Sequence, residues 1–455
     1  MSTIRSPAGH ARAAATADAS HLEGWLFGAA EDGALTHSQA RGGSPAFRLA
    51  VEASSTHAIR WGAKVQGSPR LRCDLLLTGG SVLTVDDDRN VFEPGAVAVT
   101  GDRIVVVGTV DDLSHYEPER TIDTTGSAVI PGFVDTHQHL FQYMLRGLGE
   151  GLELWAWLSD FMWPVGSAIT TAEATIGAQL GAVEAAKSGV TTVLDLHYAP
   201  TDLETILGVA SSIDEVGLRG TVAKGMMGEV TEMASKHGLA GELFSYSNAE
   251  EIEITAAAIE ARPAGSRVGV WPAPVNVICC DQQLMHDAVG LARDSGVGWH
   301  THCSEAEMDP VFYLEEYGVR PMDWLYDEGL LGHDATLVHG IFLDDSEVAR
   351  VGETGTGIAY CPISHQYIAL GVMRLRDLTG AGATVGLGLD GASGHRLDMF
   401  TCMKQAVLLQ RVHAKEPTVS NGEVANEAGA KAAELVDRAG LRALLEPWRK
   451  GLIKS

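Results

Sequence analysis

Cysteine is scarce in this chain. The 455 residues include only six cysteines, and no two of them form a CxxC pair. Disulfide frameworks and cysteine-rich zinc modules need denser, regularly spaced cysteines, so both are excluded. We therefore expect reduced, partly buried thiols at all six positions. They are Cys73, Cys279, Cys280, Cys303, Cys361 and Cys402.

Long apolar runs and basic residues are also few. No stretch of about 18 or more apolar residues occurs, and no secretory hydrophobic segment follows Met1. We therefore expect no membrane span and a cytoplasmic location. Lys and Arg number 33 against 59 Asp and Glu, which gives a formal net charge of −26. This excess argues against nucleic acid or an anionic membrane as the main partner and leaves a small-molecule substrate.

What the chain does have is glycine-punctuated alternation of apolar segments. Hydrophobic residues make up 45%, with 52 glycines, which is typical of a compact α/β enzyme. Residues 1–72 are rich in Ala, Gly and Ser without a sustained period, and we expect a poorly ordered extension there. Residues 73–127 contain β-rich runs such as CDLLLTGGSVLTV and AVAVTGDRIVVVG, separated by Gly and Asp turns. They predict a small sheet.

From residue 128 onward, strand-like runs alternate with segments that carry apolar residues at helical spacing and end in glycine, such as TAEATIGAQLGAVEAAKSG. The strand candidates are 128–139, 191–197, 219–227, 268–276, 298–305, 334–340, 357–364 and 383–391. Eight strands, each followed by a helix, predict a (β/α)8 TIM-like barrel over 128–415. A doubly wound sheet would have fewer strands and a glycine-rich phosphate loop after the first, which is absent there. We expect a helical tail over 416–455.

Histidines and acids collect at the predicted C-terminal ends of these strands, where such barrels place functional side chains. In chain order they are His137, His139, His197, His300, His302, Glu305, His339 and Asp390. Alternate side chains of an extended strand point the same way, so His137 and His139 can converge on one point. Neutral imidazoles with one carboxylate suit Zn²⁺ or Fe²⁺. One histidine at a strand end is usually an ordinary polar residue, but this set indicates a metal site.

Four motifs resemble, in order and spacing, the signatures of the amidohydrolase superfamily. They are PGFVDTHQH at 131–139, HTHCSEAE at 300–307, LVHG at 337–340 and GLGLDG at 386–391. The nearest branch contains the cytosine, 8-oxoguanine and S-adenosylhomocysteine deaminases and the triazine hydrolases (chlorohydrolases). The similarity runs from about residue 73 to about residue 415.

The resemblance implies a single divalent metal ion, with zinc favoured over iron. Its ligands would be His137, His139, His302 and Asp390. A binuclear variant of the superfamily uses a carbamylated lysine on a mid-barrel strand. Lys224 is the only candidate here, but it comes one strand early.

The resemblance also implies roles in catalysis. Glu305 would be the proton shuttle, and His339 would sit beside the metal-bound water and polarise it. Elementary chemistry agrees, because a divalent metal lowers the pKa of its water toward 7 and a departing amine needs a proton. Asp390 can accept the water proton, Glu305 can deliver one to the substrate, and His339 can stabilise developing charge.

Several further residues are candidates for substrate contact. Gln142 follows His139 by three, where related purine deaminases use a glutamine on a ring carbonyl, although a surface or supporting role is equally compatible. His197 and Tyr198 end the second strand, so either can reach a substrate. The aromatic segment 152–164 is either a lid or pocket wall, or a helix packed on the barrel.

Two features depart from the resemblance. After the seventh strand, relatives show Ser-Asn, whereas this chain has His365 in the Asn position; after Asp390 it carries Gly394 and His395 where relatives often have Asn. The C-terminus also stops at LEPWRKGLIKS, without the strands that finish the small β-sandwich formed by segments flanking the barrel. Its open edges favour a partner subunit, and we expect a homo-oligomer.

Three functions remain open from the sequence. The leading one is a metal-dependent hydrolase that deaminates an amino-substituted N-heterocycle or cyclic amidine and releases ammonia. A second uses the same site to open a cyclic amide or to displace another leaving group. A third is a non-catalytic protein on an inherited barrel, which the complete set of histidines and acids disfavours. The unrelated deaminase fold with a PCxxC motif is excluded, because the chain has no such motif.

Overall fold

The computed structural model describes residues 70–417, apart from positions 87, 89, 239, 240, 395 and 397. The predicted extension over 1–72 and the predicted tail over 416–455 therefore lie almost wholly outside the described residues. The same holds for His395.

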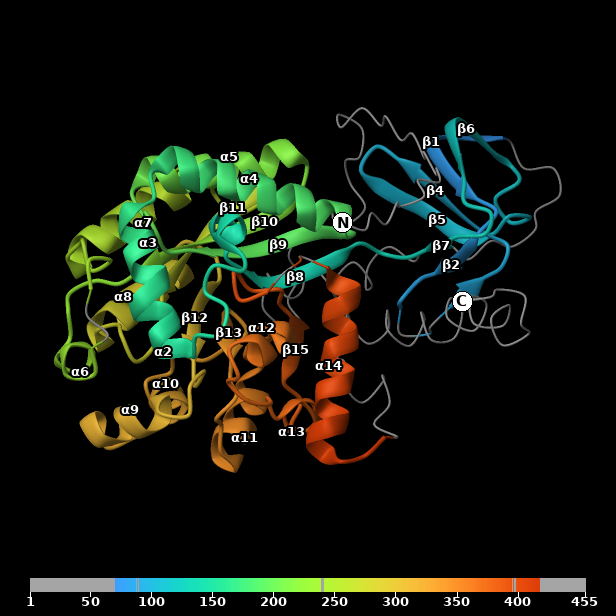
Figure 1. Ribbon diagram of the computed structural model, residues 1–455. Coiled ribbons are helices and arrows are strands. Elements are labelled where there is room, and N and C mark those ends of the chain that lie inside the picture. The colour runs from blue at the N-terminus through green and yellow to red at the C-terminus, as the bar shows by residue number, and fades with distance from the viewer. Residues whose placement is uncertain are drawn as a thin grey trace, which may run out of the picture.

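Eight strands run through the centre of the larger part of the molecule (Figure 1). They are β8 (Phe133–Gln138), β9 (Val190–His197), β10 (Arg219–Met226), β11 (Val268–Pro274), β12 (Trp299–Cys303), β13 (Ala335–His339), β14 (Gly357–Tyr360) and β15 (Thr384–Leu387). Parallel pairing gives two sheets, in the orders β11-β10-β9-β8 and β12-β13-β14-β15. Isolated bridges pair Gln138 with Asp390 and Asn276 with His302, between one sheet and the other. All eight predicted strands are present in the predicted order.

Helices follow these strands and cover their outer side (Figure 1). They are α2 (Leu154–Ala156), the π-helix η4 (Trp157–Met162), α3 (Trp163–Ala168), α4 (Thr171–Lys187), α5 (Leu203–Val216), α6 (Glu232–Lys236), α7 (Asn248–Ala261), α8 (Gln282–Asp294), α9 (Asp309–Tyr317), α10 (Pro321–Asp327), α11 (Asp345–Thr354), α12 (Pro362–Tyr367), α13 (Leu375–Gly380) and α14 (Met399–Ala414), besides the 3-10 helix η3 (Leu140–Leu145). Local sequence explains their ends. Thr170 and Glu173 form a capping box at the start of α4, and Gly217 ends α5 in the left-handed conformation.

The predicted strand over 128–139 is two strands. Residues Ala128–Val129 form β7, which pairs with β2 of the smaller part, and β8 begins only at Phe133. Pro131 and Gly132 lie between them, and proline interrupts a strand because it lacks the N–H that a ladder needs. His139 consequently lies just beyond β8, where η3 begins.

The smaller part contains two sheets built by residues 71–129. One has the order β5-β4-β1-β6 and the other β3-β2-β7. Their strands are β1 (Leu71–Thr78), β2 (Ser81–Leu83), β3 (Val91–Phe92), β4 (Gly95–Thr100), β5 (Arg103–Thr109) and β6 (Tyr116–Asp123), together with β7. Apolar residues of β1 and β4 take part in two separate buried clusters, one with Cys73 and Ala98 and the other with Leu77 and Val97. In the described part of the chain, no strand after β7 joins either sheet.

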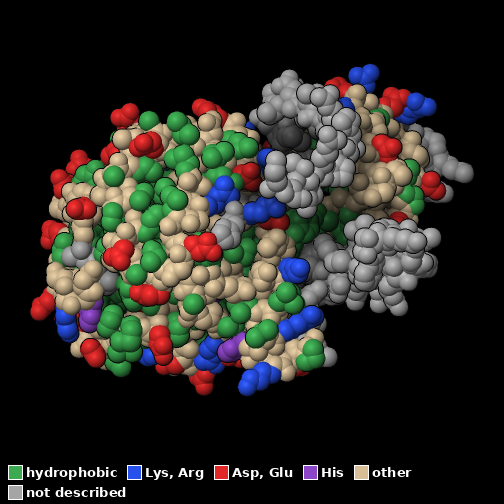
Figure 2. Space-filling model, in the orientation of Figure 1, with side chains coloured by type: hydrophobic (Ala, Val, Ile, Leu, Met, Phe, Trp, Pro, Cys, Tyr) green, Lys and Arg blue, Asp and Glu red, His purple; other side chains and the backbone are tan. Residues whose placement is uncertain are grey.

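Two expectations drawn from composition can be compared with the described residues. All six cysteines are free and buried, which confirms the expected reduced thiols. No helix within the described ranges is long and apolar enough to cross a membrane. Figure 2 shows acidic side chains spread over the visible face of the larger part, with basic ones interspersed.

Candidate metal centre

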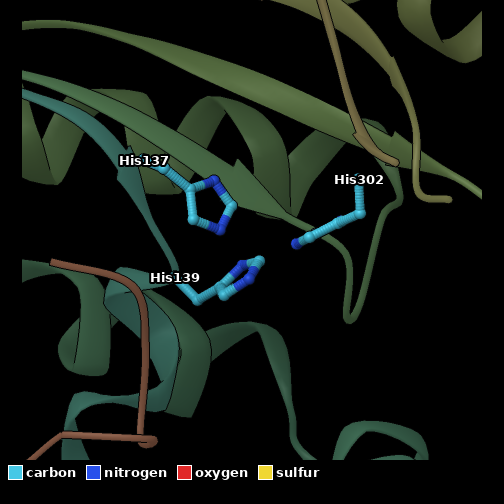
Figure 3. Close-up of side chains that lie close together, drawn as sticks. All are labelled: His137, His139 and His302. Carbon is cyan, nitrogen blue, oxygen red and sulfur yellow. The ribbon is translucent and has the colours of Figure 1, made fainter. Parts of the chain in front are cut away.

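Three imidazoles meet at the ends of two strands that are distant in sequence. His137 and His139 come from the end of β8, and His302 comes from β12. Figure 3 shows the three rings turned toward one space between these strands. One ring nitrogen from each lies within 4.8 Å of the others, and all three side chains are buried. The structure therefore brings together residues 165 positions apart, as the strand-end argument predicts (302 − 137 = 165).

Main-chain carbonyls fix the proton positions on two of these rings. Nδ1 of His139 lies 2.7 Å from the carbonyl oxygen of Leu196, and Nδ1 of His302 lies 2.6 Å from that of Val275. A carbonyl oxygen only accepts, so each ring carries its proton on Nδ1 and presents a bare Nε2. Burial lowers the pKa of His302 to about 4, so this ring is neutral and able to bind a metal ion.

His137 is oriented by a second histidine. Nδ1 of His300 lies 2.7 Å from the carbonyl oxygen of Thr336, and Nε2 of His300 lies 2.9 Å from Nδ1 of His137. The carbonyl requires the proton of neutral His300 on Nδ1, so its Nε2 must accept from His137. His137 therefore also presents a bare Nε2, which is buried and without a hydrogen-bond partner among the described atoms. His300, which was not among the predicted ligands, thus contacts a neighbouring ring and a main-chain carbonyl.

Asp390 adds a carboxylate to the three imidazoles. Its Oδ1 lies 3.6 Å from Nε2 of His137 and 3.5 Å from Nε2 of His139. The residue follows β15 and is held by its own N–H, which donates to the carbonyl oxygen of His137 at 3.0 Å. Burial by itself raises the pKa of the Asp390 carboxyl, but the interactions with the surrounding imidazoles outweigh it and hold the pKa well below its usual value. Asp390 is therefore ionised.

Glu305 and His339 lie beside this group. Nε2 of His339 is 3.3 Å from Oε1 of Glu305. Burial, together with the negative charges of Asp309 and Asp390, raises the pKa of the Glu305 carboxyl well above its usual value. Asp309 holds the segment by accepting from the N–H groups of Glu305 at 2.8 Å and Ala306 at 3.0 Å. A carboxyl group with an increased affinity for a proton is thus placed against an imidazole at the edge of the site.

Backbone strain accompanies the site. His339 has a φ of 73° and Asp390 a φ of 62°, and Ser304, next to Glu305, has a φ of 50°. Non-glycine residues in this left-handed region cost about 1–3 kcal/mol each and cluster at functional sites. The strain follows from turning each chain sharply at the end of its strand, which directs these side chains inward.

The donor set fits a divalent ion. Three Nε2 atoms and one carboxylate form the mixed nitrogen and oxygen environment that zinc and ferrous iron accept. The unpartnered Nε2 of His137 is the sharpest indication, because a buried polar atom normally finds a partner. A second overlapping group, His137, His339 and Asp390, also lies within 4.8 Å.

Gln142 and Tyr198 form a buried pair next to the site. Nε2 of Gln142 donates to the hydroxyl oxygen of Tyr198 at 2.6 Å, and Oε1 of Gln142 accepts from the N–H of Ala392 at 2.9 Å. The Tyr198 ring lies edge-on to His139, with ring centroids 5.2 Å apart. Both ends of the Gln142 amide are thus engaged within the protein, while the Tyr198 hydroxyl donates to no acceptor among the described residues.

His197, the residue before Tyr198, is also buried. Its Nε2 lies 3.0 Å from the carbonyl oxygen of Pro200, and burial lowers the pKa of the ring to about 4. Its ring also packs edge-on to Phe141. The predicted substrate role of His197 stays a prediction, since these contacts lie within the protein.

The aromatic segment 152–164 folds as the short helices α2 and η4 with the start of α3. Trp157 and Met162 are buried in an apolar cluster that also contains Tyr198, Ala306 and Ala392, residues adjacent to the site. The segment is therefore helical and packed on the barrel strands, next to the site. The π-helical turn at its centre is a form often found at functional sites.

Lys224 forms a buried ion pair with Glu251 of α7. Glu251 also accepts from the N–H of Met227 at 3.0 Å. The lysine nitrogen is thus committed to a carboxylate, which gives no support to the binuclear alternative.

Some supporting residues were not predicted. Asp135 is buried and its Oδ1 accepts from the N–H of Leu389 at 3.0 Å and of His137 at 3.3 Å, which ties β8 to the segment that carries Asp390. Asp309 and the imidazole of His365, which lies against His339, were likewise given no role. Asp135 stands two positions before His137, and this alternation with the histidines is the signal that could have found it.

Comparison with known proteins gives the family. The model of the Amidohydrolase family matches residues 128–442. The chain therefore belongs to the amidohydrolase family, and the predicted resemblance is confirmed. Its fold is TIM-barrel-like α/β.

Individual relatives indicate which members of the family this chain resembles. A 5-methylthioadenosine/S-adenosylhomocysteine deaminase of Haloarcula marismortui is 32% identical over 365 residues, covering 80% of each chain. Among solved structures, a zinc-bound adenosine deaminase from Xanthomonas campestris has a TM-score of 0.70 and 26% identity over 81% of this chain and 82% of its own. A zinc complex of an atrazine chlorohydrolase from Arthrobacter aurescens has a TM-score of 0.70 and 25% identity, over 80% and 83%. The expected hydrolase of carbon–nitrogen bonds is confirmed.

Proposed function

We propose that this protein deaminates the adenine amine of adenosine-type nucleosides altered at the 5′ position. The deaminase class follows from the family and the relatives, and the choice of nucleoside rests on the substrates of the related deaminases. The observation that carries the proposal is the meeting of the Nε2 atoms of His137, His139 and His302 with the Asp390 carboxylate, beside the buried pair of Glu305 and His339. This set supplies the groups that hydrolytic deamination needs.

We infer that His137, His139, His302 and Asp390 hold one divalent ion, with zinc favoured over iron. The bare Nε2 atoms and the zinc in related structures support this assignment. When bound, such an ion supplies Lewis acidity that lowers the pKa of water toward 7. Asp390 is ionised and can accept the proton that the attacking water gives up.

Glu305 is the proposed proton donor to the leaving nitrogen. Burial and the neighbouring acidic groups raise the pKa of Glu305 well above its usual value, so this carboxyl holds a proton more readily than an ordinary glutamate. The amine is a poor leaving group until it is protonated, so a carboxyl with its proton retained is suited to the step. His339 is placed beside Glu305 to donate a hydrogen bond from Nε2 to the oxygen or ring nitrogen that gains charge.

The surroundings support a planar, largely apolar substrate. The cluster with Trp157, Tyr198 and Ala306 lines the region next to the site with apolar surface. The free hydroxyl hydrogen of Tyr198 can donate to a ring nitrogen, while Gln142 holds the hydroxyl in place. The role of Gln142 is then to orient Tyr198, and a direct contact of Gln142 or His197 with substrate is a further proposal.

The test is ammonia release by the zinc-loaded protein. We expect turnover of 5′-methylthioadenosine, S-adenosylhomocysteine or 5′-deoxyadenosine, with adenosine as the unmodified comparison. Cytosine and atrazine are included in the same assay, the latter followed by chloride release. Turnover of atrazine alone would favour the alternative with another leaving group, and turnover of cytosine alone would replace the nucleoside by a pyrimidine.

The same observations support proposals about organisation. We infer that the eight strands close into one barrel, supported by the two bridges between the sheets, with the barrel at 128–415 and a small β-sandwich at 73–127. Ala128 and Val129 pair with Ser81 and Val82, so the proposed boundary between sandwich and barrel lies after β7 rather than at 128. A homo-oligomer and a cytoplasmic location remain proposals, the first supported by the open edges of the small sheets.

A further inference from the structure

His365 lies on α12 and is buried against His339. Its side chain is 1% exposed, and its Nε2 lies 3.0 Å from Nδ1 of His339. Its other nitrogen, Nδ1, has no hydrogen-bond partner among the described atoms. The proposed reaction gives this residue no task, yet it touches a residue that the reaction uses.

The direction of this hydrogen bond can be derived. Burial lowers the pKa of His365 to about 3, so the ring is neutral and carries one proton. If His339 donated, the proton of His365 would sit on Nδ1, as a buried N–H without an acceptor. If His365 donates from Nε2, its Nδ1 is only a bare lone pair. Buried N–H groups without a partner are rarer than under-satisfied acceptors, which favours the second arrangement.

The far side of His339 favours the same arrangement. Nε2 of His339 faces Oε1 of Glu305 at 3.3 Å. With Nδ1 accepting from His365, the proton of neutral His339 lies on Nε2 and points at an oxygen that accepts it. The reverse arrangement would leave Nε2 bare, so that His339 would take a hydrogen bond from the very proton of Glu305 that the proposed reaction gives to the leaving nitrogen.

We propose that His365 is a positioning residue that fixes His339 as the tautomer with its proton on Nε2. His339 then presents a hydrogen-bond donor toward the reacting atoms whenever substrate is bound. The helix that carries His365 is itself anchored to the loop after Asp390, through a 2.9 Å hydrogen bond between the hydroxyls of Ser393 and Ser364. The consequence for catalysis rests on the proposed function, but the position of the proton does not.

The first test is nitrogen NMR of the zinc-loaded protein labelled with ¹⁵N in histidine. His339 is assigned by comparison with a His339→Asn variant. We expect a protonated Nε2 and a bare Nδ1 on His339, and loss of this single tautomer in His365→Phe. A proton on Nδ1 of His339 in the unaltered protein would overturn the proposal, and so would an unchanged tautomer in His365→Phe. This readout needs no substrate, so it remains decisive if the proposed substrate is wrong.

The second test separates positioning from structure. In His365→Phe we expect kcat to fall by about 10- to 100-fold, as is usual for partners of this kind, with KM and bound zinc nearly unchanged. His365→Gln keeps a donor near the position of Nε2 and should recover most of the loss, and it also serves if the Phe variant does not fold. The control is His286→Gln, which replaces a half-exposed ring on α8 that faces Glu328. An unchanged kcat in His365→Phe, or a Gln variant no better than Phe, would contradict the assignment.

Discussion

Two pairs of buried histidines have nearly the same geometry, but we infer that their hydrogen bonds run in opposite directions. In each pair, Nδ1 of the inner ring meets Nε2 of the outer ring, at 2.9 Å for His137 and His300 and at 3.0 Å for His339 and His365. The outer ring of the first pair donates its own proton to the carbonyl of Thr336. The outer ring of the second pair has no partner at the corresponding nitrogen among the residues that the structure describes.

That difference decides what each inner ring presents. A carbonyl at the far end leaves His300 able only to accept, so His137 turns a bare nitrogen toward the site. With no acceptor at the far end, His365 is inferred to donate, so His339 turns an N–H toward the site. In the proposed site, histidine thus supplies a metal ligand in one place and a hydrogen-bond donor in the other. The group bound at the far nitrogen of the outer ring makes the difference.

The largest expected effect follows from removing one of the histidines whose Nε2 is proposed to bind the metal ion. His137→Ala should lose zinc and lower kcat/KM by about 10³-fold or more, because a metal ion contributes several kcal/mol of transition-state stabilisation. Bound zinc is measured by elemental analysis beside the activity. Stripping the unaltered protein with a chelator should have the same effect, and one equivalent of zinc should reverse it. Full activity in a chain without zinc would contradict the metal assignment.

Glu305→Gln should have the next largest effect. It removes the acidic proton but keeps the size of the side chain, so kcat should fall by about 10²- to 10⁴-fold while zinc stays bound. Near-normal turnover with zinc bound would show that another group protonates the leaving nitrogen. Asp309→Asn is a useful companion, because it tests whether the charge next to Glu305 matters beyond holding the loop.

Substitutions of the two outer histidines, His300 and His365, should have different effects. His300→Leu should weaken zinc binding by about 10- to 100-fold, whereas His365→Phe should lower kcat by a similar factor with zinc binding kept. Zinc affinity is measured by competition with a chromogenic chelator. If both variants lose zinc equally, then the two pairs do the same task and the comparison is wrong.

The smallest expected effect concerns Tyr198 and Gln142, which belong to neither histidine pair. Tyr198→Phe removes one neutral hydrogen bond, worth about 0.5–1.5 kcal/mol, so kcat/KM should fall by about 2- to 10-fold with zinc unchanged. Gln142→Leu should produce a similar loss if its task is to orient Tyr198. A much larger loss in Gln142→Leu than in Tyr198→Phe would instead indicate that Gln142 contacts the substrate itself.

The sequence predicted the order of strands because each buried parallel strand is a short apolar run, and the helices between them begin and end at recognisable caps. It also predicted which side chains meet, since the strand ends of such a fold lie at one edge. It did not separate β7 from β8, although Pro131 is the residue that breaks the strand. The sequence also did not predict the left-handed backbone conformation at His339 and Asp390, because neither residue is a glycine.

The sequence also could not predict which ring nitrogen of each histidine carries the proton, for a different reason. Which nitrogen of His137 is bare depends on the carbonyl of Thr336, a main-chain atom on another strand. The departure at His365 was visible as an unusual residue, but its partner 26 positions earlier was not. The sequence indicates the donor set, and only the packing of β12, β13 and α12 determines what each ring offers.

The most direct measurement is an anomalous-scattering map at the zinc edge from crystals of the zinc-loaded protein. We expect one zinc site, bound through Nε2 of His137, His139 and His302 and through a carboxylate oxygen of Asp390. Zinc at another place, or coordination through Nδ1 of any of these rings, would contradict the account.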